Sequence, residues 1–109
     1  MPTLVAYESD GPRPCGEVVL DDGSRIRVSL GADGGAIENL PAGGIAHELL
    51  FRASPDLAAW ICVSLREGES AAAAPLDIVL DLVMRLGTVA AVKAAFAAAA
   101  TRYRPRGGA

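Results

Sequence analysis

The chain has 109 residues, 51% of them apolar, and a formal net charge of −3. This length suits a single domain with one modest core, and the apolar fraction overstates that core because 21 residues are alanines, whose side chains bury little area. The acidic balance argues against a general nucleic-acid surface, and no charge-free stretch approaches the roughly 20 residues that a membrane-spanning helix needs.

The first half of the chain predicts an antiparallel sheet. Residues 3–7 have the composition of a short strand, whereas the prolines and glycines of residues 8–16 exclude a helix or a central strand there. Residues 17–20 and 25–30 flank an Asp-Asp-Gly-Ser turn, in which Gly23 can supply the positive φ of a tight hairpin. Apolar and polar residues alternate along the second strand, so one face of the hairpin should be buried.

The middle of the chain allows two interpretations. Residues 36–40 are expected to form a brief strand. Residues 45–53 place apolar side chains on one helical face but also alternate as a strand would, and we prefer the helix. Ser54 and Pro55 could begin a helix, as its cap and first residue, or could belong to a type I turn. The apolar run 57–65 cannot be assigned from periodicity alone.

The last third predicts an alanine-rich helical hairpin. In residues 75–86 the apolar side chains recur at helical spacing, with Asp77, Asp81 and Arg85 on the opposite face. Asp81 and Arg85 are four residues apart, the spacing of a helical ion pair. We therefore expect an ordinary amphipathic helix.

The second helix of this hairpin, residues 88–103, should begin after a break at Gly87, with Thr88 as its cap. Lys93 is its only charged residue before Arg102. A helix without a polar face is normally covered on most sides, so we expect a second copy or another protein to cover what the domain leaves bare. The residues predicted to bind that partner are Val89, Val92, Phe96, Arg102, Tyr103 and Arg104.

The residue types that catalysis needs are scarce. His47 is the single histidine and is expected on the surface, so no two-histidine metal site can form. The glycine-rich residues 31–35 lack the Lys-Ser/Thr of a phosphate-binding loop. Cys62 should be buried, and Cys15 should be exposed in a loop with no group beside it but Arg13 to activate its thiol. We predict no catalytic residue, no metal ligand and no cofactor.

Few cysteines and the absence of an apolar signal segment in residues 1–7 predict a cytoplasmic protein with two free thiols, although Cys15 and Cys62 could pair. The predicted fold is α+β: an N-terminal antiparallel sheet, with hairpin 17–30, followed by helices 75–86 and 88–103. Residues 1–103 should form one domain and residues 104–109 a flexible basic tail.

These features favour a non-enzymatic interaction or regulatory module that self-associates through its last helix. A small-ligand binder or accessory enzyme subunit is the alternative, and it would need a cavity between sheet and helices with Arg25, Arg27, His47 or Tyr7 as its polar groups. Nucleic-acid contact through the arginine-rich tail comes third, because a basic end to a helix is also simply favourable to the helix dipole. Trp60 is expected in the core rather than as a recognition aromatic.

Overall fold

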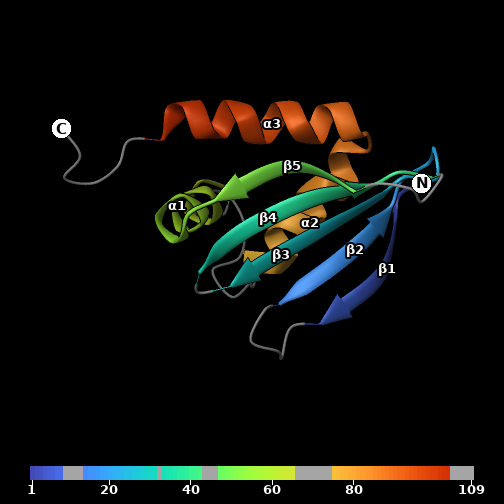
Figure 1. Ribbon diagram of the computed structural model, residues 1–109, viewed down its shortest axis with the longest axis horizontal. Helices are drawn as coiled ribbons and strands as arrows, with labels where there is room; N and C mark the ends of the chain where they lie inside the picture. Colours follow the sequence, from blue (N-terminus) through green and yellow to red (C-terminus); the bar gives the residue numbers. More distant parts are fainter. Residues whose placement is uncertain (9–13, 32, 43–46, 66–74, 104–109) are drawn as a thin grey trace.

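The computed structural model describes residues 1–8, 14–31, 33–42, 47–65 and 75–103, and of residues 62–65 and 75 it describes the backbone alone. These segments form a five-stranded antiparallel sheet followed by three helices, which confirms the predicted α+β fold (Figure 1). The strands are β1 (Thr3–Glu8), β2 (Cys15–Val19), β3 (Arg25–Gly31), β4 (Gly34–Leu40) and β5 (Glu48–Ala53). The helices are α1 (Pro55–Leu65), α2 (Pro75–Leu86) and α3 (Val89–Arg102).

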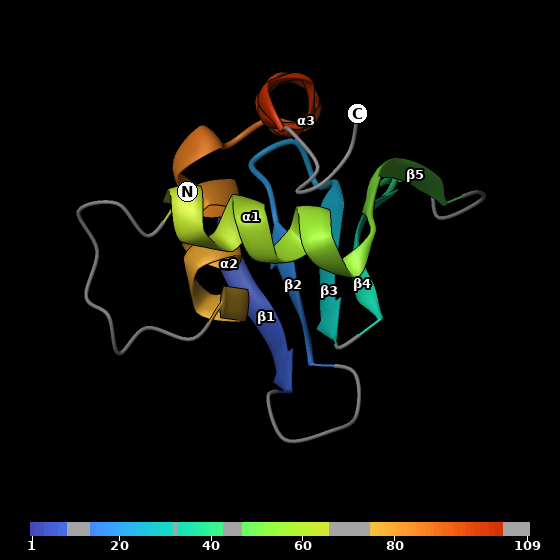
Figure 2. The same ribbon diagram turned by 90° about the vertical axis from the view of Figure 1, so that its left-hand side faces the viewer.

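The sheet is a meander in which each strand pairs with its neighbour in sequence. Its two faces differ because successive side chains of a strand point in opposite directions. Val18, Ile26, Val28 and Ile37 are buried on the face that the helices cover. α2 packs on β2 and β3, α1 packs on β4 and β5, and α3 lies against β5 and the other two helices (Figure 2).

The hairpin of β2 and β3 forms where the sequence predicts it. Gly23 has a φ of 89°, and its amide donates to the carbonyl oxygen of Leu20 over 3.0 Å. The side chain of Asp22 accepts a hydrogen bond of 2.9 Å from the amide of Ser24. Turn chemistry and strand alternation therefore agree, which is why this element was predictable.

The expectation that no central strand includes residues 8–16 is wrong for Cys15 and Gly16. These two residues begin β2, which lies between β1 and β3, whereas Glu8 is the last residue of the end strand β1. Glycine allows α2 to pack closely here, since a Cβ on Gly16 would lie 2.6 Å from Cδ1 of Leu80 on α2 and that side chain would have to move. Cys15 is half-buried in the strand rather than exposed in a loop, and its thiol is free.

The preferred helix over residues 45–53 is also wrong, because the part that the structure describes includes strand β5. Phe51 lies opposite Ile37 on β4, and the register shifts at the next pair, Glu38 with Leu49. The local pattern suited both structures. The long edge of β4 decided between them by offering a row of backbone partners that an isolated short helix cannot match.

The apolar run after Ser54 is a helix, α1. Of the two interpretations of Ser54 and Pro55, the helix start is confirmed. The Oγ of Ser54 accepts a hydrogen bond of 3.2 Å from the amide of Leu57, and Pro55 is the first helical residue. The carbonyl of Ser54 also accepts from the amide of Ala58 over 2.9 Å. Trp60 is partly buried against the core, as predicted.

The break between the last two helices confirms the predicted boundaries. Gly87 has a φ of 77°, and Thr88 caps α3 by accepting a 3.1 Å hydrogen bond from the amide of Ala91. α2 buries Leu76, Val79, Leu80 and Val83 against the sheet. The chain then turns so that α3 runs beside β5 (Figure 1).

Candidate functional site

The inner face of α3 belongs to the domain's own core. Val92 is 0% exposed and Phe96 3% exposed. The ring of Phe96 lies 5.4 Å from that of Phe51 on β5, centroid to centroid. Both side chains were predicted to bind a partner, but the fold covers them, so any binding surface on α3 must be made of other residues.

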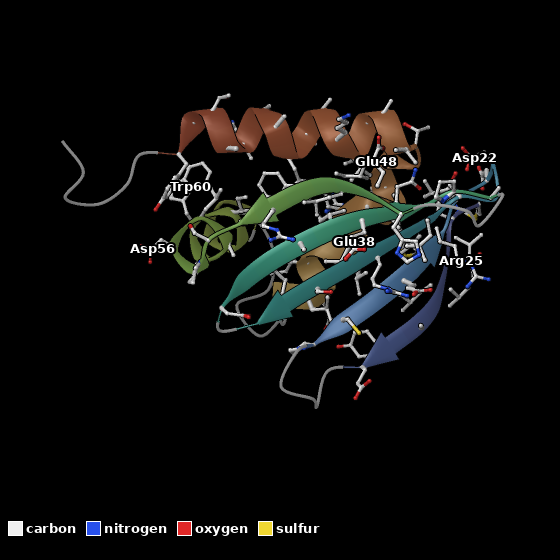
Figure 3. All side chains as sticks on the ribbon, viewed as in Figure 1. Asp22, Arg25, Glu38, Glu48, Asp56 and Trp60 are labelled. Atoms are coloured by element: carbon white, nitrogen blue, oxygen red, sulfur yellow. The ribbon has the colours of Figure 1, made fainter. Side chains whose placement is uncertain are left out.

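The remaining predicted binding residues lie at the two ends of the helix. Val89 is half-buried and packs against the core at the start of α3. Tyr103 is half-buried at its end, edge-on to Trp60 of α1 with 5.7 Å between ring centroids, and Figure 3 shows Trp60 beneath this end of α3. Arg102 is exposed, and Arg104 lies outside the described residues.

The outer face of α3 is made chiefly of alanine. Its exposed residues are Ala90, Lys93, Ala94, Ala97, Ala98, Thr101 and Arg102. At 100° per residue, the four residues Ala90, Ala94, Ala97 and Thr101 fall within a sector of about 60°, which we call the alanine stripe. Lys93 stands on one flank of the stripe, and Ala98 and Arg102 stand on the other. The surface thus has small apolar residues at its centre and cations at its margins.

A groove opens on the flank that carries Arg102. It has a volume of about 470 Å³ and lies between α3 and the first two helices. Ile61 and Leu82 form the side contributed by α1 and α2, and Ala95 and Ala98 are among the residues that α3 contributes. The bare surface of α3 therefore continues from the alanine stripe into a largely apolar depression.

The sequence pointed to α3 but not to this stripe. The prediction chose large apolar residues as the binding surface, but folding buries these residues. The alanine side chain is too small to indicate a binding surface by itself. The signal was nevertheless present in the periodicity. Once Val92, Phe96 and Ala99 are taken as the inner face, the residues two positions away from them must face outward.

The polar groups of the ligand-binding hypothesis do not converge. Arg27 lies on the open face of the sheet, where its Nε and Nη2 donate to Oε1 of Glu17 over 2.8 and 2.6 Å. Arg25 is 3.7 Å from the other oxygen of the same carboxylate. Tyr7 lies on the helix-covered face instead, and its hydroxyl donates to Asp77 of α2 over 2.6 Å.

Opposite charges lie along the open face of the sheet, and a depression of about 350 Å³ has Ser29, Glu38 and Arg52 among its lining residues. None of Arg25, Arg27, His47 and Tyr7 lines it. Figure 3 views this face and shows Arg25 and Glu38 on it. His47 lies with Nδ1 3.6 Å from Oε2 of Glu38 and is exposed, as predicted. The hydrogen bond with Glu17 is the main cause that raises the pKa of Arg27. Because the folded-state pKa of Arg27 is raised, the stabilisation that its cation contributes would be lost as the pH rose through that pKa.

The space between sheet and helices is filled by side chains. The cavity there, with Val28, Ile37, Phe51 and Phe96 in its walls, has a volume of about 20 Å³. A single water needs at least about 10–15 Å³ by the same measure, so this cavity can hold one water and no larger ligand. It provides no support for the ligand-binding alternative.

Among the described residues, no three histidine, cysteine or acidic side chains come close enough together to hold a metal ion. None of the helices formed by these residues is long and apolar enough to cross a membrane.

The chain matches no family model, no curated protein and no solved structure.

Proposed function

We propose that this chain is a non-enzymatic interaction module that self-associates through the outer face of α3. The observation that carries the proposal is the alanine stripe, a surface of small apolar residues on a helix whose exposed charges are confined to Lys93 and Arg102. A cytoplasmic location fits the proposal, because Cys15 is a free thiol.

Alanine suits a helix-to-helix contact for two physical reasons. It lets two helices approach to the short end of the usual 8–10 Å between axes, where many backbone and Cβ atoms come into contact. It also has no side-chain rotamers to lose when the surface is buried, which lowers the entropic cost of association. Lys93 and Arg102 would then lie at the rim, where charged groups can stay hydrated.

The test is the molar mass in solution at low micromolar concentration, measured by light scattering. We expect the wild-type mass to be at least twice that of one chain. Replacing both Ala94 and Ala97 by Glu would place two carboxylates at the centre of the contact. This should at least halve the fraction of chains associated through α3. The matched control is Ala59→Glu, at an exposed alanine on α1, which should leave the mass unchanged.

Two results would contradict the proposal. One is a wild-type mass equal to one chain throughout the concentration range. The other is a double variant that keeps the full wild-type mass while its circular dichroism shows an intact fold. Glu is a good helix former, so these exposed substitutions should change the helix little.

A further inference from the structure

A second bare surface lies at the other side of the molecule, along β1. Five large apolar residues of the described chain are strongly exposed, and four of them are Met1, Leu4, Val5 and Tyr7. Leu4 is 41% exposed, Val5 49% and Tyr7 46%. All six residues of β1 are exposed, so this strand is apolar without being covered.

β1 is also an end strand of the sheet. It pairs with β2 on one side, and on the other side the described residues provide no partner strand. A free edge presents a row of backbone N–H and C=O groups that can pair with another strand. Proteins often protect such an edge with charges along it, yet residues 3–7 carry none. Figure 1 shows β1 at the edge of the sheet remote from α3.

A bulge in β1 determines which side chains share a face. Leu4 lies opposite Val18 and Tyr7 opposite Gly16, and the register shifts between them at Val5. Leu4 and Tyr7 therefore both point to the helix-covered face, although three residues apart they would point to opposite faces of a regular strand. Thr3 and Glu8, opposite Val19 and Cys15, both point to the open face.

We propose that β1 pairs antiparallel with β1 of a second copy of this chain and joins two sheets into one of ten strands. The register places Leu4 opposite Tyr7 of the second copy and Thr3 opposite its Glu8. The two side chains of each pair point to the same face of the joined sheet. Without the bulge, Leu4 and Tyr7 would point to opposite faces of the strand and could not pair in this way. At the centre Val5 lies opposite Ala6 of the second copy, so no like charges are brought together.

The occupant is a second copy because the strand complements itself. Two identical edges related by a two-fold axis perpendicular to the sheet run antiparallel and keep their helices on the same side. The exposed Leu4 and Tyr7 of both copies would then lie side by side, between the two α2 helices. This interface goes beyond the proposed function, because it uses the opposite edge of the sheet from α3 and both contacts can form at once.

The first experiment separates the two interfaces by molar mass. In the Ala94→Glu/Ala97→Glu background, β1 pairing should leave a mass of two chains, and adding Val5→Lys should halve it. The control is Leu49→Lys, the same charge at a residue of β5 that is 48% exposed, which should leave the mass at two chains. Circular dichroism checks that each variant is folded.

The outcomes distinguish failure of one proposal from failure of the other. If the α3 double variant keeps the wild-type mass and Val5→Lys lowers it, β1 pairing stands and the α3 proposal fails. If Val5→Lys lowers the mass no more than Leu49→Lys, β1 pairing is overturned. A wild-type protein with the mass of one chain would overturn both, and the bulge at Val5 would then be the device that keeps the edge unpaired.

The second experiment tests the register. Cys15 and Cys62 are first replaced by alanine. The Leu4→Cys/Tyr7→Cys variant should then form disulfide-linked dimers under mild oxidation, because the thiol at position 4 faces the thiol at position 7 of the second copy. Leu4→Cys alone is the control. Its thiol would lie opposite Tyr7 of the second copy, three residues away from the other new thiol, so no disulfide should form. Equal cross-linking of the single and double variants, or none in either, would contradict the proposed pairing.

Discussion

α2 and α3 follow one another directly, yet their outer faces are built on different plans. Among the described side chains of α2, the exposed ones are Asp77, Asp81 and Arg85, all of them charged. α3 exposes four alanines and only two charged residues along a slightly longer helix. Both helices bury an apolar inner stripe. The two helices therefore differ in the composition of their exposed positions and not in whether they bury an apolar face. A helix with charged exposed positions is complete within its domain, whereas one with apolar exposed positions has a surface that a partner could cover.

The charged face of α2 is also engaged within the domain. Arg85 Nη2 lies 2.9 Å from Oδ2 of Asp81, as its spacing predicts, and Asp77 accepts the hydroxyl of Tyr7. These contacts tie the helix to itself and to β1.

The largest expected effect concerns the inner face of α3. Phe96→Ala would remove the ring that contacts Phe51 and leave a cavity, which should lower the free energy of unfolding by about 3–5 kcal/mol. Urea denaturation followed by circular dichroism measures this loss. Ala97→Ser on the outer face is the control and should change stability by about 0.5 kcal/mol or less. Equal effects at the two positions would erase the distinction between inner and outer faces.

The next effect concerns the junction of the two helices. Gly87→Ala should cost about 1–2 kcal/mol, because φ is 77° there and a side chain is disfavoured in that conformation. No atom lies within 4 Å of the added Cβ, so the cost would come from the backbone and not from a clash. Gly87→Asn should lose less, since asparagine tolerates this region better. If alanine and asparagine behave alike in urea denaturation, backbone strain is not the cause.

The smallest effect concerns the outer face of α2. Asp81→Asn should lower the free energy of unfolding by only about 0.3–0.5 kcal/mol, because the pair with Arg85 is more than half exposed and is screened by salt. A double-mutant cycle with Arg85→Gln isolates the pair. The molar mass should not change. An Asp81→Asn variant with an altered mass would show that α2, and not only α3, contributes to association.

Prediction from the sequence succeeded where local chemistry and periodicity agreed. Gly23 and its flanking strands, and Gly87 with Thr88 between two helices, carry their own turn and capping signals. It failed for β5, whose apolar pattern suits a helix equally well. There the pairing of Phe51 with Ile37 on β4 decided, and no local signal reports such a contact.

The candidate surfaces were predictable only in part. The low charge of α3 is visible in the sequence and directed attention to that helix, whose exposed residues are mostly alanines. Which of its side chains remain bare was not visible, because Val92 and Phe96 are covered by contacts with distant segments. The exposed β1 edge could not be anticipated either, since a strand of the same composition would be covered in the middle of a sheet.

The sequence by itself determined the α+β class, the central hairpin, the two C-terminal helices and their boundaries, because turns, caps and helical periodicity depend on neighbours within a few residues. The tertiary structure decided the fold of residues 48–65, the placement of Gly16 under Leu80, and the division of α3 into a buried and a bare face. These depend on which strand lies beside which and on what packs above them. Such contacts join residues far apart in the chain, and only folding brings them together.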